Sequence, residues 1–166
     1  MPLNELLLRE YEMEMANTQK TLERVPVEHW DWKPQEKSGT LGWMAGHVAT
    51  LPGFTWVTLS TPELNMGGSN ADFPRVTKHS EMLPKFNELR QLAREQLAKA
   101  TDEQLKEPWT LRRGDTVIFT MPRYDVLRLF CMNHIIHHRG QLTMYLRALG
   151  VPVPALYGPS ADEGAF

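Results

Sequence analysis

The sequence has 166 residues, with 18 basic and 20 acidic side chains and a formal net charge of −2. This length predicts one domain over residues 1–166, and the evenly mixed charge excludes the basic face of a nucleic-acid-binding protein. A single cysteine, Cys131, excludes an internal disulfide and fits a reducing compartment. The sequence has no run of about 18 apolar residues that could span a membrane and no signal-peptide pattern, so we expect a cytoplasmic protein.

Apolar residues recur at helical spacing in four stretches of the chain. They predict long helices over residues 3–25, 40–60, 80–100 and 122–149. The second helix should bend near residues 49–52, because Pro52 has no amide hydrogen to donate to the preceding turn. Thr101 and Gln104 match a capping box, which predicts a short helical turn at residues 102–106.

Two connections between these helices are long enough to carry structure of their own. Residues 61–79 are rich in glycine, proline and asparagine, which predicts a long loop. Residues 108–121 contain two β-type runs around a turn, which predicts a small hairpin or an extended crossover. Taken together, the elements predict an all-α protein: a four-helix bundle with a long loop after its second helix and a short crossover before its fourth.

Three of the six histidines fall in the apolar stripes of the second and fourth predicted helices. His134 and His138 are four residues apart, so their side chains should lie one above the other, about 5–6 Å apart at Cβ. This is the spacing at which two helical imidazoles share one metal ion. His47 lies in the stripe of the second helix, whereas His137 points to the side of its own helix.

The simplest interpretation of a single buried histidine is a hydrogen-bonded structural residue, and this applies to His47 taken alone. Three core histidines would leave six ring nitrogens to be satisfied, and a divalent metal would take one nitrogen from each ring. Three imidazole ligands leave a coordination position open, as in catalytic sites. Zn²⁺, Ni²⁺, Cu²⁺ and Fe²⁺ all suit such ligands. Gln141 lies on the same arc, where it would either support a ligand histidine or face the substrate. No separate general base is evident, and Glu10 and Glu14 on the first helix are the acidic residues that could approach the histidines.

Two segments resemble the signature segments of the DinB-like (damage-inducible) metal-binding superfamily. They are Thr40–Ala49, with the sequence TLGWMAGHVA, and Asn133–Leu142, with the sequence NHIIHHRGQL. The upstream tripeptide Trp32-Lys33-Pro34 also fits the family pattern.

The resemblance implies a four-helix bundle, a homodimer and a divalent metal held by His47, His134 and His138. Characterised members of the family include thiol S-transferases that use bacillithiol or mycothiol, and a maleylpyruvate isomerase. A small-molecule thiol or an electrophile is therefore the partner that the resemblance implies. The mixed charge and the lack of a long apolar run predict no role for nucleic acid or a membrane.

Four functional interpretations stay open at this point. The first is a metal-dependent thiol S-transferase. The second is a non-catalytic, stress-related metal-binding protein, and the third is a metal-dependent hydrolase, which would need a positioned base. The fourth is a metal-free bundle in which hydrogen bonds satisfy the core histidines.

Overall fold

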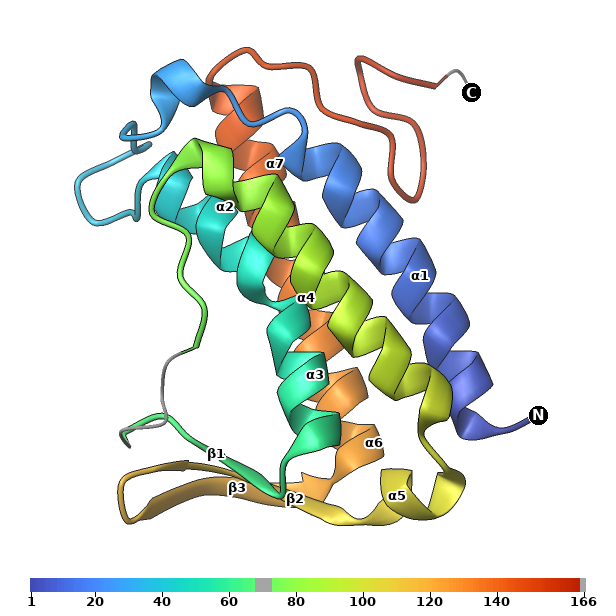
Figure 1. Cartoon of the computed structure of the whole chain (residues 1–166). Coiled ribbons are helices and arrows are strands. Elements are labelled where there is room, and N and C mark those ends of the chain that lie inside the picture. Colours follow the sequence, from blue (N-terminus) through green and yellow to red (C-terminus); the bar gives the residue numbers. More distant parts are fainter. Residues whose placement is uncertain (68–72, 165–166) are drawn as a thin grey trace.

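The computed structural model describes residues 1–67 and 73–164, and its main body is a bundle of helices (Figure 1). Residues 68–72 of the predicted long loop, and 165–166 of the predicted domain, lie outside the described residues. The bundle helices are α1 (Leu3–Leu22), α2 (Leu41–Thr50), α3 (Pro52–Ser60), α4 (His79–Lys99) and α7 (Asn133–Ala148). The short helix α5 (Asp102–Lys106) occupies the predicted helical turn. Helices therefore lie in all four long stretches that the apolar spacing predicts.

The predicted all-α class is wrong, because a three-stranded mixed sheet closes one end of the bundle (Figure 1). Its strands are β1 (Glu63–Asn65), β2 (Pro108–Arg113) and β3 (Thr116–Pro122). β2 and β3 form an antiparallel hairpin around Gly114, whose φ of 58° suits a turn. β1 pairs with β2 in parallel, so part of the predicted long loop becomes a strand. Three residues are too few to show a strand periodicity in the sequence.

Proline divides the second predicted helix into two. Pro52 stands at the first position of α3, where a missing amide hydrogen costs nothing. The same residue cannot continue α2, which ends at Thr50. The bend expected at residues 49–52 is thus a break between two helices.

The fourth predicted helix is also not uniform. It begins as α6 (Arg123–Asp125), continues as the π-helix η2 (Val126–Met132) and becomes regular in α7. The wider π turns change the register of every later side chain relative to a continuous α-helix. This shift matters because the two predicted ligand histidines of this helix come directly after η2.

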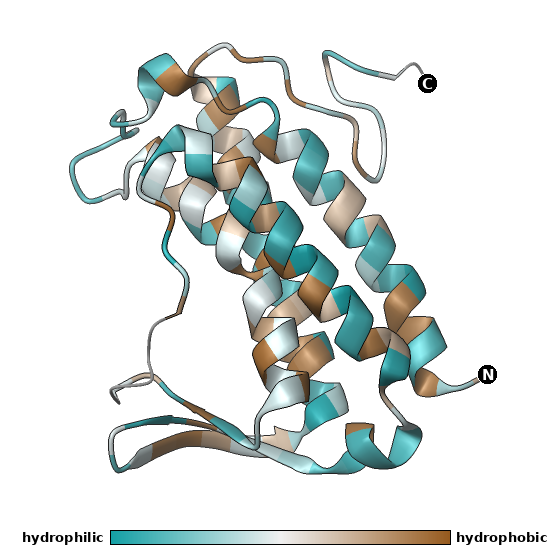
Figure 2. Ribbon diagram, viewed as in Figure 1, coloured by the Kyte–Doolittle hydropathy of each residue, from teal (hydrophilic) through white to brown (hydrophobic). Residues whose placement is uncertain are grey.

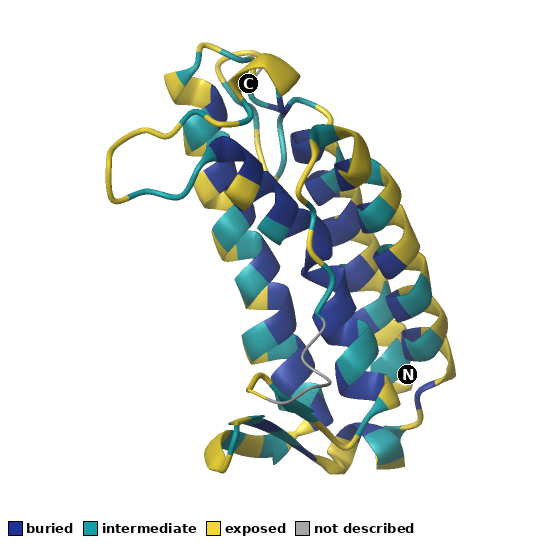
Figure 3. Ribbon diagram, turned by 60° about the vertical axis from the view of Figure 1, so that its left-hand side comes forward, coloured by how far each residue is buried: buried dark blue, intermediate teal, exposed yellow. Residues whose placement is uncertain are grey.

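Hydrophobic and buried residues lie mainly on the inward faces of the helices, and hydrophilic, exposed residues lie on their outer faces (Figures 2 and 3). The core continues into the sheet through Trp109 and Leu111 of β2, which are both buried. Arg123 ties the sheet end to α3, because its guanidinium donates to the carbonyl oxygens of Thr58 and Thr61. Among the described residues, no helix is long and apolar enough to cross a membrane.

The chain after α7 folds back beside α1 (Figure 1). Three polar contacts hold it: one to α1, one to Arg24 just after α1, and one to α7. The Tyr157 hydroxyl donates to Oε2 of Glu14 at 2.6 Å, Glu163 pairs with Arg24, and Asp162 pairs with Arg147. Tyr157 therefore brings the C-terminal segment to a buried ionic pair of the bundle, described below.

Candidate metal site

The structure brings His47, His134 and His138 together where α2 contacts α7. One ring nitrogen from each of the three lies within 4.8 Å of the other two. The closest pair is Nε2 of His47 and Nε2 of His134, which are 3.3 Å apart. Among the residues that the structure describes, this is the one group of three or more potential ligands close enough to share an ion.

The three histidines lie at the edge of the buried stripe and not at its centre. In α7 the buried positions are Ile135, Arg139, Leu142 and Leu146. His134 and His138 precede the first two of these by one residue, so both rings are half-buried. His47 is half-buried on α2 as well. A ligand can therefore reach the rings from outside, which a central position in the core would prevent.

The donor set fits a divalent ion of the transition series. Two nitrogens that bind one tetrahedral Zn²⁺ at 2.0–2.1 Å are about 3.3 Å apart, which matches the separation of His47 and His134. The group contains neither a carboxylate nor a thiolate within residues 1–67 and 73–164. Imidazole alone suits Zn²⁺, Ni²⁺, Cu²⁺ or Fe²⁺ better than Mg²⁺ or Ca²⁺, which prefer oxygen.

Burial keeps the three rings in the neutral form that binds metal. Burial, with a smaller contribution from the neighbouring His138, lowers the pKa of His47 and of His134 to about 4. The pKa of His138 is also lowered, chiefly by burial. Near neutral pH all three rings therefore present a lone pair without first losing a proton.

Metal affinity should consequently resist mild acid. Three imidazoles with ordinary pKa values would lose about a thousandfold in affinity between pH 7.5 and 5.5, because protons compete for their nitrogens. Because the pKa values of these three histidines lie below the ordinary value, we expect the metal affinity to fall less than about tenfold between pH 7.5 and 5.5. A chelator-competition titration with Ni²⁺ at both pH values measures the ratio. A thousandfold loss would show that the rings titrate as exposed histidines do.

Two neighbouring side chains fix the orientation of two of the three rings. Nδ1 of His138 lies 2.6 Å from Oε1 of Gln141, so its N–H donates to the amide oxygen and leaves Nε2 with a lone pair. The indole of Trp43 stacks on the ring of His47, with 5.3 Å between ring centroids and 11° between planes. Gln141 therefore supports His138, which is one of the two roles expected from its place on the helix.

Replacing Gln141 with alanine should weaken metal binding without removing a ligand. The loss of its hydrogen bond frees the His138 ring to rotate and to change tautomer. Removing a partner of this kind typically lowers metal affinity about 10- to 100-fold. Isothermal titration with Zn²⁺ measures the change, and Thr143→Ala on the same helix is the control, because its hydroxyl contacts only the Gly140 carbonyl. Equal affinities for wild type and Gln141→Ala would contradict this role.

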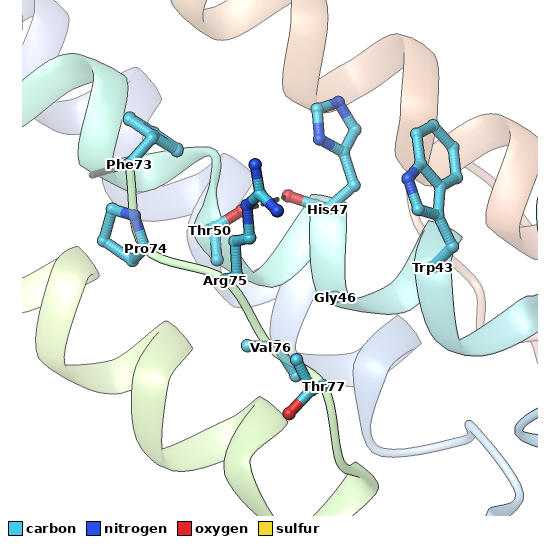
Figure 4. Close-up of a pocket in the computed structure, with 9 residues that line it drawn as sticks. All are labelled: Trp43, Gly46, His47, Thr50, Phe73, Pro74, Arg75, Val76 and Thr77. Carbon is cyan, nitrogen blue, oxygen red and sulfur yellow. Dashed lines mark hydrogen bonds between the residues drawn. The ribbon is translucent and has the colours of Figure 1, made fainter. Parts of the chain in front are cut away.

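A pocket of about 500 Å³ opens beside His47 (Figure 4). One wall comes from α2 and the other from residues 73–77, which run along that helix. Gly46 allows this close approach, since a Cβ at its position would lie 3.0 Å from the Val76 carbonyl oxygen. Among the described residues that line it, Arg75 is the one with a formal charge, and Figure 4 shows its side chain extending toward α2.

Sequence reasoning did not identify Trp43 and Arg75 at the site, nor the buried Arg139 that follows His138 on α7. Trp43 and Arg75 gave no signal, because stacking and pocket lining depend on which elements meet. Arg139 did carry a detectable sequence signal, because it lies four residues after Ile135 and three residues before Leu142, in the buried stripe of the helix. A charged residue at such a position predicts a buried partner.

Neither acidic residue considered as a base reaches the histidines as a free carboxylate. Glu14 pairs with Arg139 through atoms 2.7 Å apart, and both side chains are almost fully buried. Glu10 pairs with Arg128 at 3.0 Å. Both carboxylates therefore have structural partners, and the candidate site has no acidic neighbour that could serve as a base among the residues described.

Together, the fold and the site define a helical-bundle protein with a half-buried group of three histidines beside an open pocket. Comparison with known proteins gives the family. Residues 1–165 match the DinB family, and the chain belongs to it. This confirms the resemblance read from the two histidine segments.

Similar proteins agree over most of the chain. The uncharacterized protein YrdA of Bacillus subtilis (strain 168) is 28% identical over 162 residues, covering 95% of this chain and 90% of that protein. A DinB-like protein from Bacillus cereus ATCC 10987 has a TM-score of 0.71 at 25% identity, over 92% of this chain and 97% of its own. The DinB-like protein YjoA of Bacillus subtilis has a TM-score of 0.70 at 18% identity, over 93% and 99%, and shares the fold.

Proposed function

We propose that this DinB-family protein binds one divalent metal ion through His47, His134 and His138, and that it is a metal-dependent thiol S-transferase. The observation that carries the proposal is the meeting of three neutral imidazole nitrogens within 4.8 Å, beside an open pocket. Three protein ligands leave room for a substrate atom, as catalytic metal sites do.

The chemistry of a thiol suits a site without a base. When bound, a divalent metal lowers the pKa of a coordinating thiol and so supplies the thiolate that acts as nucleophile. The sulfur attacks an electrophilic carbon, a C–S bond forms, and the leaving group departs with its electron pair. The thiol proton passes to solvent, so no carboxylate of the protein is needed.

The protein side chains would supply position. Gln141 fixes the His138 ring, and Trp43 covers one face of His47. Hydrolysis is the weaker proposal, because a hydrolase normally places a general base near the attacking water. The two candidate carboxylates, Glu10 and Glu14, are held in ion pairs instead.

A thiol-conjugation assay tests the proposal directly. Protein loaded with Zn²⁺ or Ni²⁺ is incubated with bacillithiol, mycothiol or glutathione and an alkylating electrophile, and thioether formation is followed. We expect turnover with at least one thiol, and no turnover by metal-free protein or His47→Ala. Stoichiometric metal binding without turnover on any thiol would refute the transferase and support a non-catalytic metal-binding protein.

The single domain, the homodimer and the cytoplasmic location stay predictions. Size-exclusion chromatography with light scattering tests the second of these.

A further inference from the structure

Arg75 places a positive charge in the wall of the pocket beside the candidate metal ligands. It lines the same pocket as His47, and its side chain is solvent-exposed (Figure 4). No acidic side chain within residues 1–67 and 73–164 forms a salt bridge with it. Its guanidinium is therefore available to a ligand that enters the pocket.

Within the residues that the structure describes, the pocket lining carries the positive charge of Arg75 and no carboxylate of its own. The carboxylate of Glu81 touches the lining at Thr77, where it accepts hydrogen bonds from the backbone N–H groups of Thr77 and Lys78. The hydroxyls of Thr50 and Thr77 already donate to His47 O and to Glu81 Oε2. A divalent ion on the histidines would add to the positive charge of Arg75. A positive site of this kind attracts an anionic ligand.

We infer that Arg75 binds a carboxylate of the substrate. The inference rests on the proposed function, because it assigns one group of the molecule that this site would take. The planar guanidinium offers paired N–H donors that match the two oxygens of a carboxylate. A volume of about 500 Å³ suits a small molecule. The site thus selects a small carboxylate-bearing substrate, with one end at the histidines and its carboxylate at Arg75.

The apolar residues of the same pocket add contact area, but they do not discriminate between charged and neutral ligands. Trp43, Phe73 and Val76 all line it. Because these residues contact neutral and anionic ligands alike, discrimination between an acid and its amide falls to Arg75. The substitution Arg75→Gln removes the charge from an exposed side chain, so the fold should be unaffected.

A pair of thiols that differ by one charge provides the binding test. N-acetylcysteine carries a carboxylate, and N-acetylcysteine amide does not. Each is titrated into Co²⁺-loaded protein, and the sulfur-to-cobalt absorption band reports binding without any turnover. We expect Arg75→Gln to weaken N-acetylcysteine binding about tenfold and the amide less than about twofold. Arg75→Lys should give an intermediate loss, and Arg94→Gln on the exposed outer face of the bundle should give none.

A second pair shows whether the carboxylate belongs to the thiol or to the electrophile. Iodoacetate and iodoacetamide are compared as alkylating partners, and Arg75→Gln should raise KM for iodoacetate alone if the electrophile supplies the carboxylate. The inference is overturned if Arg75→Gln affects acid and amide equally in both pairs, or affects neither. Failure of turnover with every thiol would refute the transferase, while the cobalt titration would still decide the role of Arg75.

Discussion

Replacing His134 with alanine should lower the affinity for Zn²⁺ or Ni²⁺ more than about 100-fold, because a ligand loss exceeds the effect of a lost supporting residue. Nε2 of His134 lies 3.3 Å from Nε2 of His47, so its removal leaves two of the three nitrogens. Two imidazoles do not provide the three protein ligands of a catalytic site. Competition with a chromogenic chelator measures the affinity of each variant.

His137 provides the matched control for this substitution. It lies on the same helix, it is exposed, and it does not belong to the group that can share an ion. His137→Ala should bind metal as wild type does, and circular dichroism should show the same helix content for both variants. If His134→Ala kept wild-type affinity, or if His137→Ala lost as much, the assignment of the ligands would be wrong.

Replacing Arg139 with methionine should destabilise the fold by about 3–5 kcal/mol, the largest stability effect that we expect in this protein. The guanidinium pairs with Oε2 of Glu14 at 2.7 Å, and 1% and 4% of the two side chains are exposed. It also donates to Thr18 Oγ1 and to the Tyr157 hydroxyl. Methionine keeps much of the volume but leaves the Glu14 carboxylate buried without its cation. Urea unfolding at pH 7 measures the free energy.

A surface pair between two helices supplies the comparison for Arg139. Arg94 and Glu12 are 2.9 Å apart, but nearly half of each side chain is exposed. Arg94→Met should therefore cost less than about 1 kcal/mol. Adding Glu14→Leu to Arg139→Met should recover stability, because no charge is then buried alone. Equal losses for Arg139→Met and Arg94→Met would contradict a buried ionic pair that holds α7 against α1.

The helical part of the fold was predictable because it depends on local periodicity. The four apolar stripes gave the positions of the bundle helices, and Pro52 gave the place of the bend. The sheet was predictable only in its hairpin. β1 is three residues long, and its pairing depends on β2, which lies more than forty residues later. A non-local partner of this kind leaves no pattern in a short segment, and for that reason the all-α prediction was wrong.

The histidines of the candidate site were predictable, but their surroundings were not. The i, i+4 spacing of His134 and His138 and the place of His47 in a helical stripe were enough to select the three that meet. All three are half-buried and not central in the core as predicted, and for His134 and His138 the π-helix η2 changes the register before α7. The stacking of Trp43 and the pocket position of Arg75 follow from how α2 meets other segments, and helical periodicity does not contain that information.

X-ray absorption spectroscopy of the Zn²⁺-loaded protein tests the central claim most directly, because it counts the imidazole ligands around the ion. The account predicts one Zn²⁺ per chain with three imidazole nitrogens at about 2.0–2.1 Å, and fewer in His47→Ala. A first shell of oxygens alone, or a spectrum that His47→Ala leaves unchanged, would contradict it.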